Sequence, residues 1–197
     1  MDYGRSFTYM FKQPDVWKKI LIGGLLLLVP VIGWLWVGGY TLRTLRSVMT
    51  GSENLPEWTR WGDLATQGIY VWLGGLIYGL PGAVLGRLGT PGSILSGLWS
   101  IVVIVVLPAA LMRFAAKGDF GAFFDFNDIF TFINRNLSNY LIVVLLSILA
   151  YIIASFGVVL LVIGVLFTSF WGMLVTAHLY GSLARTTGLP LQFGTTR

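Results

Sequence analysis

The stretch Val29-Pro30-Val31-Ile32-Gly33 interrupts an apolar run that extends from Ile20 to Tyr40. A single crossing of a bilayer takes about 20 apolar residues, so this run has the length of one membrane helix. Proline removes a backbone donor and clashes with the preceding turn of a helix, so Pro30 favours a break within the run. Two interpretations follow: one crossing, or a hairpin of two short helices that turns near Pro30.

The distribution of Lys and Arg separates these interpretations. If the run crosses once, a cytoplasmic N-terminus leaves five of the thirteen basic residues inside and eight outside, against the positive-inside rule. The reverse orientation gives only a weak bias. If the run forms a hairpin, Arg87 is the only basic residue outside, and all eight acidic residues are cytoplasmic. We therefore predict a short or re-entrant helix pair over residues 16–48, with both chain termini in the cytoplasm.

The composition is typical of a membrane protein. Of 197 residues, 56% are hydrophobic and 11% are charged, against about 25% charged residues in soluble domains. The basic residues adjoin apolar runs, which indicates membrane anchoring rather than nucleic-acid binding. Without cysteine the chain has neither disulfides nor thiolate metal sites. Three further apolar regions are Gly68–Leu88, Ile94–Phe114 and Leu137–Arg185, and the last is long enough to fold back once, near Gly157 and Gly164.

These patterns predict an all-α fold, a polytopic transmembrane helical bundle of about six membrane segments, in a single domain over residues 1–197. After the helix pair, crossings are expected near 68–86, 94–114, 138–156 and 160–183. Amphipathic interfacial helices are expected at 3–13, 56–66 and 121–134. Pro14-Asp15 is the expected start of the first membrane helix, with Asp15 capping its free N–H groups. The expected location is the cytoplasmic (inner) membrane of a prokaryote.

Two connectors resemble each other. Tyr40-Thr41-Leu42-Arg43 is followed by a Gly and acid pair, two aromatic residues, Asp63 and an aliphatic residue. Ala110-Leu111-Met112-Arg113 is followed by the same order, which ends at Asp128-Ile129. The match predicts an internal repeat of about 31–90 and 94–185. The alternative is that any connector between membrane helices is aromatic and charged in this way.

Three stretches resemble one known family. They are Phe11-Lys12-Gln13-Pro14-Asp15-Val16-Trp17-Lys18-Lys19-Ile20, Gly39-Tyr40-Thr41-Leu42-Arg43 and Leu55-Pro56-Glu57-Trp58-Thr59-Arg60-Trp61-Gly62-Asp63-Leu64. Together they are similar to the prokaryotic membrane family called domain of unknown function 4013, over most of the chain. Thr59-Arg60 departs from the acidic residues expected between the tryptophans, so this connector is less negative. The family has no assigned activity, so the resemblance implies a class and leaves the function open.

The sequence predicts no catalytic or metal-binding residues and no cofactor, and it does not indicate cofactor-binding residues. Seven residues are candidates for contact with a partner or a lipid: Trp58, Trp61, Asp63, Phe124, Asp125, Asp128 and His178. Trp58 and Trp61 would share a helix face and anchor it at the interface, or form a docking surface for a partner or a lipid headgroup. Asp125 and Asp128 are expected to face the cytoplasm. His178 is the only histidine, so a structural polar role near a helix end is favoured over metal binding.

Small residues recur at a spacing of four along the second apolar region. Gly75-Leu76-Ile77-Tyr78-Gly79 and Gly82-Ala83-Val84-Leu85-Gly86 both allow helices to approach closely. Internal packing is the expected use of both patterns, rather than dimerisation.

The missing chemistry favours a non-enzymatic integral membrane protein, an accessory or scaffolding subunit of a larger membrane assembly. Its expected partners are membrane lipids and other membrane-protein chains, not nucleic acid. The alternative is a transport or lipid-handling protein, which a continuous polar cavity at the bilayer midplane would support. A membrane enzyme is the third possibility, and it would have to work with surface acids and one histidine.

Overall fold

The computed structural model describes residues 3–157 and 163–192, and every regular element in these ranges is helical. The all-α prediction is therefore confirmed for this part of the chain. The elements are α1 (Tyr3–Thr8), the 3-10 helix η1 (Tyr9–Lys12), α2 (Val16–Leu27), α3 (Ile32–Met49), α4 (Trp61–Leu85), α5 (Gly89–Lys117), the 3-10 helix η2 (Phe120–Phe124), α6 (Phe126–Arg135), α7 (Leu137–Ser155) and α8 (Ile163–Thr186).

The break in the first apolar run is confirmed, because α2 ends at Leu27 and α3 begins at Ile32. The N–H of Gly33 donates to the Val29 carbonyl oxygen at 3.0 Å and closes the turn. The start of α2 also lies where it was predicted, but Asp15 makes no side-chain capping bond. The capping prediction was therefore wrong.

Three helices among the described residues, α4, α5 and α7, have the length and apolar composition of membrane spans. The number of six membrane segments stays a prediction. With 12 residues, α2 is shorter than the roughly 20 that a perpendicular crossing requires. The turn predicted near Gly157 and Gly164 falls largely on residues 158–162, which lie outside the described residues; α7 ends at Ser155 before it.

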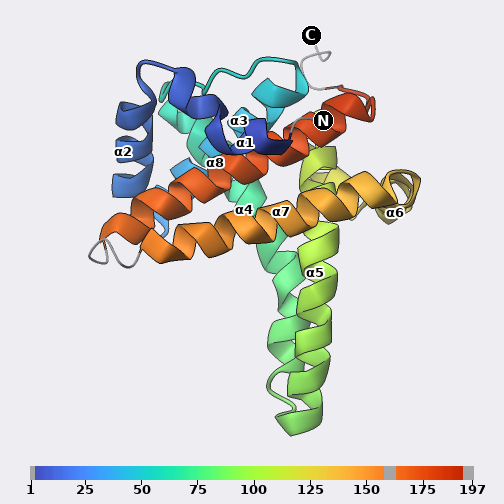
Figure 1. Ribbon diagram of the computed structural model, residues 1–197. Helices are drawn as coiled ribbons and strands as arrows, with labels where there is room; N and C mark the ends of the chain where they lie inside the picture. Colours follow the sequence, from blue (N-terminus) through green and yellow to red (C-terminus); the bar gives the residue numbers. More distant parts are fainter. Residues whose placement is uncertain (1–2, 158–162, 193–197) are drawn as a thin grey trace.

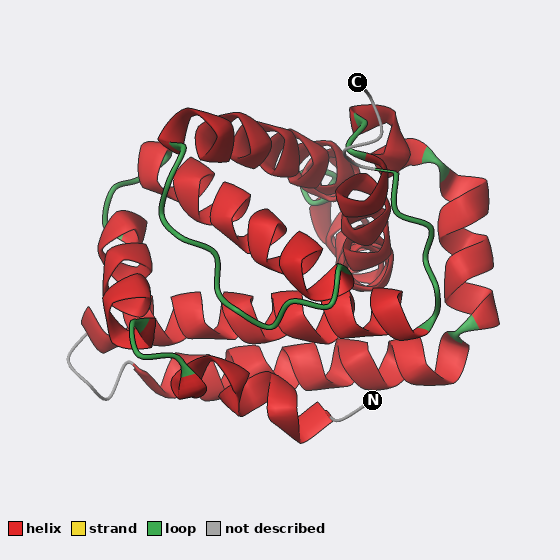
Figure 2. Ribbon diagram, turned by 90° about the horizontal axis from the view of Figure 1, so that it is seen from above, coloured by secondary structure: helices red, strands yellow, loops and turns green. Residues whose placement is uncertain are grey.

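Helices α4 and α5 form a long hairpin that projects from the rest of the molecule, and α7 and α8 lie crosswise to it (Figures 1 and 2). The connection between α4 and α5, residues 86–88, forms the far tip of this hairpin (Figure 1). Large apolar side chains are exposed along the hairpin and along α7, among them Leu76, Leu80, Ile101 and Leu145. Water does not favour so much exposed apolar surface, so lipid or protein is its expected surrounding.

The core lies where α3, α8 and the end of α5 meet. Its largest fully buried side chains include Tyr40, Phe114, Phe123, Tyr140 and Phe170.

Close packing of α3 against α4 depends on two glycines. A Cβ at Gly39 would overlap the backbone carbonyl of Leu64, and a Cβ at Gly68 would overlap that of Leu35. Glycine at these positions lets the two backbones touch, as small residues do between membrane helices.

Two of the three predicted interfacial segments are helical as expected. Residues 3–13 correspond to α1 and η1, and residues 121–134 to η2 and α6. One face of α6 is buried through Ile129, Phe132 and Ile133, so this helix is amphipathic. The helix predicted at 56–66 is wrong in its first half, because residues 56–60 are not helical and α4 begins at Trp61. The contacts of this connector explain why.

Candidate functional site

The connector of residues 51–60 is bound first by side chains at the start of α2. The Gln13 amide donates to the Glu53 carbonyl oxygen at 3.1 Å and accepts the Leu55 N–H at 2.9 Å. The buried ammonium of Lys19 donates to the Leu55 carbonyl oxygen at 2.9 Å and pairs with Glu57 at 2.6 Å. A buried ammonium is costly unless it has such partners, so Lys19 fixes the connector in one conformation.

Side chains of α3 bind the connector from the other side. The Tyr40 hydroxyl donates to the Pro56 carbonyl oxygen at 2.8 Å, and Arg43 donates to the Thr59 carbonyl oxygen at 2.9 Å. Pro56 has no N–H to donate, and the carbonyls that a helix would use already accept side-chain bonds. For this reason residues 56–60 are not helical. The three stretches that carry the family resemblance thus contact one another.

Trp58 lies at the centre of these contacts. Its indole is 9% exposed, stacks on the Tyr40 ring at 4.0 Å between centroids, and donates to the Lys19 carbonyl oxygen at 3.2 Å. Trp58 and Trp61 do not share a helix face as predicted, because Trp58 precedes α4. Their rings nevertheless stack, with centroids 5.6 Å apart. Trp61 is 40% exposed, and the predicted Asp63 is an exposed residue that pairs with Arg60 at 3.6 Å.

A second cluster joins the end of α5 to the start of α6. Lys117 pairs with Asp125 at 2.7 Å, and the buried guanidinium of Arg113 contacts both Asp125 and Asp128. The hydrogen bond from Lys117 is the main cause that lowers the pKa of Asp125 below its ordinary value. Two cations of α5 thus bind these acids, and their location on the cytoplasmic side stays a prediction.

Phe124 belongs to the aromatic packing beside this cluster. Its ring stacks on Tyr78 with centroids 6.1 Å apart, and the Tyr78 hydroxyl donates to the Phe123 carbonyl oxygen at 2.5 Å. The half-buried Phe124 therefore ties η2 to α4.

Arg43 and Arg113 have similar roles in the two connectors. Arg43 binds carbonyl oxygens 14 and 16 residues later in the chain, and Arg113 binds carboxylates 12 and 15 residues later. Each arginine lies within the last two turns of its helix and binds the connector that follows. This likeness agrees with the internal repeat, which stays a prediction.

His178 is buried, with 3% of its surface exposed, and it joins α8 to the N-terminal segment. Its Nδ1 lies 2.9 Å from the Ser6 hydroxyl oxygen, and its ring lies on the Tyr9 ring with centroids 4.1 Å apart. Burial raises the pKa of the Tyr9 hydroxyl. These contacts give His178 a packing role. Within residues 3–157 and 163–192, no three His, Asp or Glu side chains are grouped so as to hold a metal ion.

The seven predicted contact residues therefore fall into three separate groups. No hydrogen bond, ion pair or ring contact in the described part of the chain links Trp58, Trp61 or Asp63 to Asp125 or His178. Sequence reasoning did not single out the residues that hold the connector, which are Gln13, Lys19, Tyr40 and Arg43. The family resemblance was the signal that included all four, and the internal repeat also included Tyr40 and Arg43.

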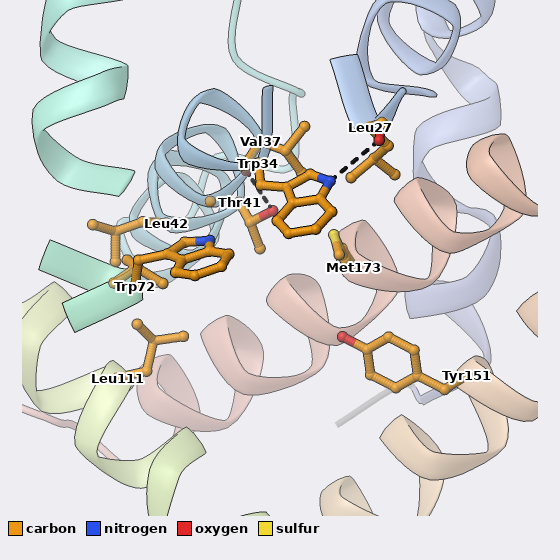
Figure 3. Close-up of a pocket in the computed structure, with 11 residues that line it drawn as sticks. Leu27, Trp34, Val37, Thr41, Leu42, Trp72, Leu111, Tyr151 and Met173 are labelled. Carbon is orange, nitrogen blue, oxygen red and sulfur yellow. Dashed lines mark hydrogen bonds between the residues drawn. The ribbon is translucent and has the colours of Figure 1, made fainter. Parts of the chain in front are cut away.

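Two apolar cavities lie between the helices. One, of about 400 Å³, is bordered by Trp34, Trp72, Met173 and Tyr151 (Figure 3). The other, of about 620 Å³, lies between α5, α7 and α8. Both are lined by Leu111 and Tyr151, so they adjoin. Their linings are mainly apolar with a few hydroxyl groups, which suits a hydrophobic occupant better than a polar solute.

The two small-residue patterns of α4 face different ways. A Cβ at Gly82 would lie 3.0 Å from the Trp99 ring of α5, so internal packing is confirmed there. Gly75 and Gly79 have no atom within 4 Å of a built Cβ, so internal packing was a wrong expectation for this pair. They line an open groove of about 580 Å³ together with Ala83 and Leu107.

Comparison with known proteins gives a family and one relative. The family described as "Protein of unknown function (DUF4013)" matches residues 22–163, more than half of the chain. The uncharacterized protein MJ1189 of Methanocaldococcus jannaschii is 26% identical over 136 residues, which cover 60% of this chain and 47% of that protein. The chain thus spans about half the length of this relative. No solved structure matches.

Proposed function

We propose a function for this chain, which belongs to the DUF4013 family of proteins of unknown function: it is a non-enzymatic accessory or scaffolding subunit of a larger membrane assembly. Its α4–α5 hairpin docks a transmembrane helix of another membrane protein. The observation that carries this proposal is the outward groove of Gly75, Gly79 and Ala83. Small residues four apart allow a second helix backbone to approach closely within a bilayer.

The surroundings of the groove support a helix as its occupant. Val71, Leu76, Leu80 and Leu107 border the small residues, so the walls are apolar and the floor carries no side chain larger than the methyl group of Ala83. Lipid tails cover apolar side chains without needing a glycine floor, whereas a helix gains close contact from one. The groove is open, because Gly75 and Gly79 have no atom within 4 Å of a built Cβ. The hairpin that carries it projects from the rest of the molecule (Figure 1).

The test is capture of the tagged protein from gently solubilised native membranes, with mass spectrometry of the retained chains. We expect one or more other membrane chains in fixed ratio. Gly75→Ile with Gly79→Ile fills the groove and should release them. Gly97→Ile is the matched control, because Gly97 on α5 also faces open space but does not line the groove. Recovery of the wild type alone, or only with further copies of itself, contradicts the proposal.

Lipid handling is the second candidate, and the adjoining cavities at Leu111 and Tyr151 favour it. Leu111→Trp fills the junction between them and should lower the amount of lipid that co-purifies. Leu98→Trp, at an exposed position of the hairpin, is the control. Equal lipid content in both variants and the wild type would count against this function.

A further inference from the structure

A small cavity of about 220 Å³ opens between the start of α2, the connector and the start of α4. Its lining combines two acids, two lysines, two indoles and one aliphatic side chain, which are Asp15, Glu57, Lys18, Lys19, Trp58, Trp61 and Ile22. We propose that this cavity binds the zwitterionic, phosphate-bearing headgroup of a membrane lipid. The site is separate from the groove of α4 and does not rest on the function proposed above.

The charges of the cavity suit a zwitterion. Lys19 and Glu57 pair with each other at 2.6 Å, which leaves Asp15 and Lys18 as the free charges. Both are exposed, and neither forms an ion pair within residues 3–157 and 163–192. One free cation and one free anion complement a headgroup with a phosphate and an ammonium group. An anionic headgroup without an ammonium group would leave Asp15 unpaired.

The start of α2 supplies further donors for the phosphate. Asp15 makes no capping bond, so the N–H groups of Trp17 and Lys18 in the first turn have no side-chain acceptor. Free N–H groups at a helix N-terminus, together with the helix dipole, favour a bound phosphate. The Lys18 ammonium lies on the same turn and adds its charge. The phosphate is therefore assigned to Lys18 and the first turn of α2.

The ammonium group is assigned to the free Asp15 carboxylate together with the facing residues Glu57 and Trp61. Glu57 keeps 68% of its side chain exposed although it pairs with Lys19. The Trp61 indole is 40% exposed and stacks on Trp58, which fixes its position. Carboxylates and aromatic rings both attract an ammonium group.

Exposed apolar residues beside the cavity indicate a lipid rather than a free headgroup. Trp17, Leu21, Leu25 and Leu28 follow one another on the same face of α2 at helical spacing, and all are exposed. This row starts next to Lys18 and runs along α2, which stands at the edge of the molecule (Figure 1). The chains of a lipid whose headgroup occupies the cavity would lie along it.

Native mass spectrometry of the delipidated full-length protein tests the site, with phosphatidylethanolamine or phosphatidylglycerol added in detergent. We expect the first bound lipid to be phosphatidylethanolamine, preferred several-fold over phosphatidylglycerol. Asp15→Asn with Lys18→Gln should remove this preference. Lys12→Gln with Asp119→Asn makes the same charge changes outside the cavity and should keep it.

Three results would overturn the proposal. The first is equal binding of both lipids by the wild type, a result that needs no variant. The Asp15 and Lys18 variant could keep the preference while it unfolds at the wild-type temperature. Soluble phosphoethanolamine could compete with the lipid at equal concentration, in which case the ligand is a free zwitterion and not a lipid.

Discussion

The Trp58 indole lies flat on the Tyr40 ring, with centroids 4.0 Å apart and planes inclined by 16°. The same indole donates to the Lys19 carbonyl oxygen, so one side chain joins the connector to both α2 and α3. The Tyr40 hydroxyl completes the arrangement through its bond to the Pro56 carbonyl oxygen. The conformation of the connector therefore depends on contacts between distant parts of the chain.

Replacement of Trp58 should destabilise the protein strongly. Trp58→Ala removes a buried ring and leaves a cavity, which costs about 3–5 kcal/mol in the free energy of unfolding. Trp17→Ala is the control, because Trp17 is 69% exposed; its expected effect is within about 0.5 kcal/mol. Denaturant unfolding in detergent micelles measures both, and equal losses would contradict the role given to Trp58.

Lys19 and Lys18 are neighbours with different surroundings, so they make a matched pair. Lys19→Met leaves the Leu55 carbonyl and Glu57 without their donor and should cost about 1.5–3 kcal/mol, the range for hydrogen bonds to charged groups. Lys18→Met removes an exposed side chain without an ion pair and should change the stability by less than about 0.5 kcal/mol. The same unfolding assay measures both variants. A larger loss of stability in Lys18→Met than in Lys19→Met would contradict the role given to Lys19.

Three glycines should respond differently to alanine. Gly39→Ala and Gly68→Ala push α3 and α4 apart and should each cost about 1–3 kcal/mol or more, as overpacked cores do. Gly75→Ala meets no atom within 4 Å and should be neutral or stabilising by up to about 1 kcal/mol through helix propensity. Thermal unfolding of the three purified variants gives the order. Loss of stability in Gly75→Ala equal to that in Gly39→Ala would mean that α4 does not face outward there.

Asp125 should make part of the stability depend on pH. Its pKa in the folded chain lies below the ordinary 3.8, chiefly because Lys117 donates a hydrogen bond to the carboxylate. A lowered pKa contributes stability above the ordinary pKa, and this contribution is lost as the pH falls through the lowered value. Wild type should therefore be more stable than Asp125→Asn near about pH 7. The difference should shrink as the pH falls below about 4 and vanish only when the pH is below the lowered pKa of Asp125. Asp119→Asn is the control. A stability difference between wild type and Asp125→Asn that grows as the pH falls would contradict this prediction.

The topology can be tested with single cysteines, because the chain has none of its own. An impermeant thiol reagent should label Arg87→Cys on intact cells and Ser52→Cys only after the membrane is opened. Phe156→Cys, at the end of α7, tests whether this helix, which lies crosswise to α4 and α5, crosses the membrane. Six crossings predict labelling of Phe156→Cys from outside, and labelling of Ser52→Cys on intact cells would overturn the orientation.

The helices themselves were largely predictable. Pro30 breaks any helix that contains it, so the division of the first apolar run follows from one residue. The apolar stretches near 68–86, 94–114 and 138–156 became α4, α5 and α7. Helix α4 begins seven residues before its predicted start, α5 is longer by five residues at its start and three at its end, and α7 is shifted by one residue. The connector could not be predicted in this way, since the charged and aromatic composition of residues 56–66 suits an interfacial helix equally well.

The sequence by itself determined the membrane class, the all-helical fold, the break at Pro30 and the family, because apolar length and helix breakers act locally along the chain. Only the tertiary structure decided that Trp58 stacks on Tyr40, that Lys19 is buried against the connector, and that Gly75 faces outward while Gly82 packs on Trp99. The two glycine pairs of α4 follow the same local pattern, but α5 packs on Gly82 and nothing packs on Gly75. Which element packs against a glycine depends on the packing of the whole chain, and a local pattern cannot predict it.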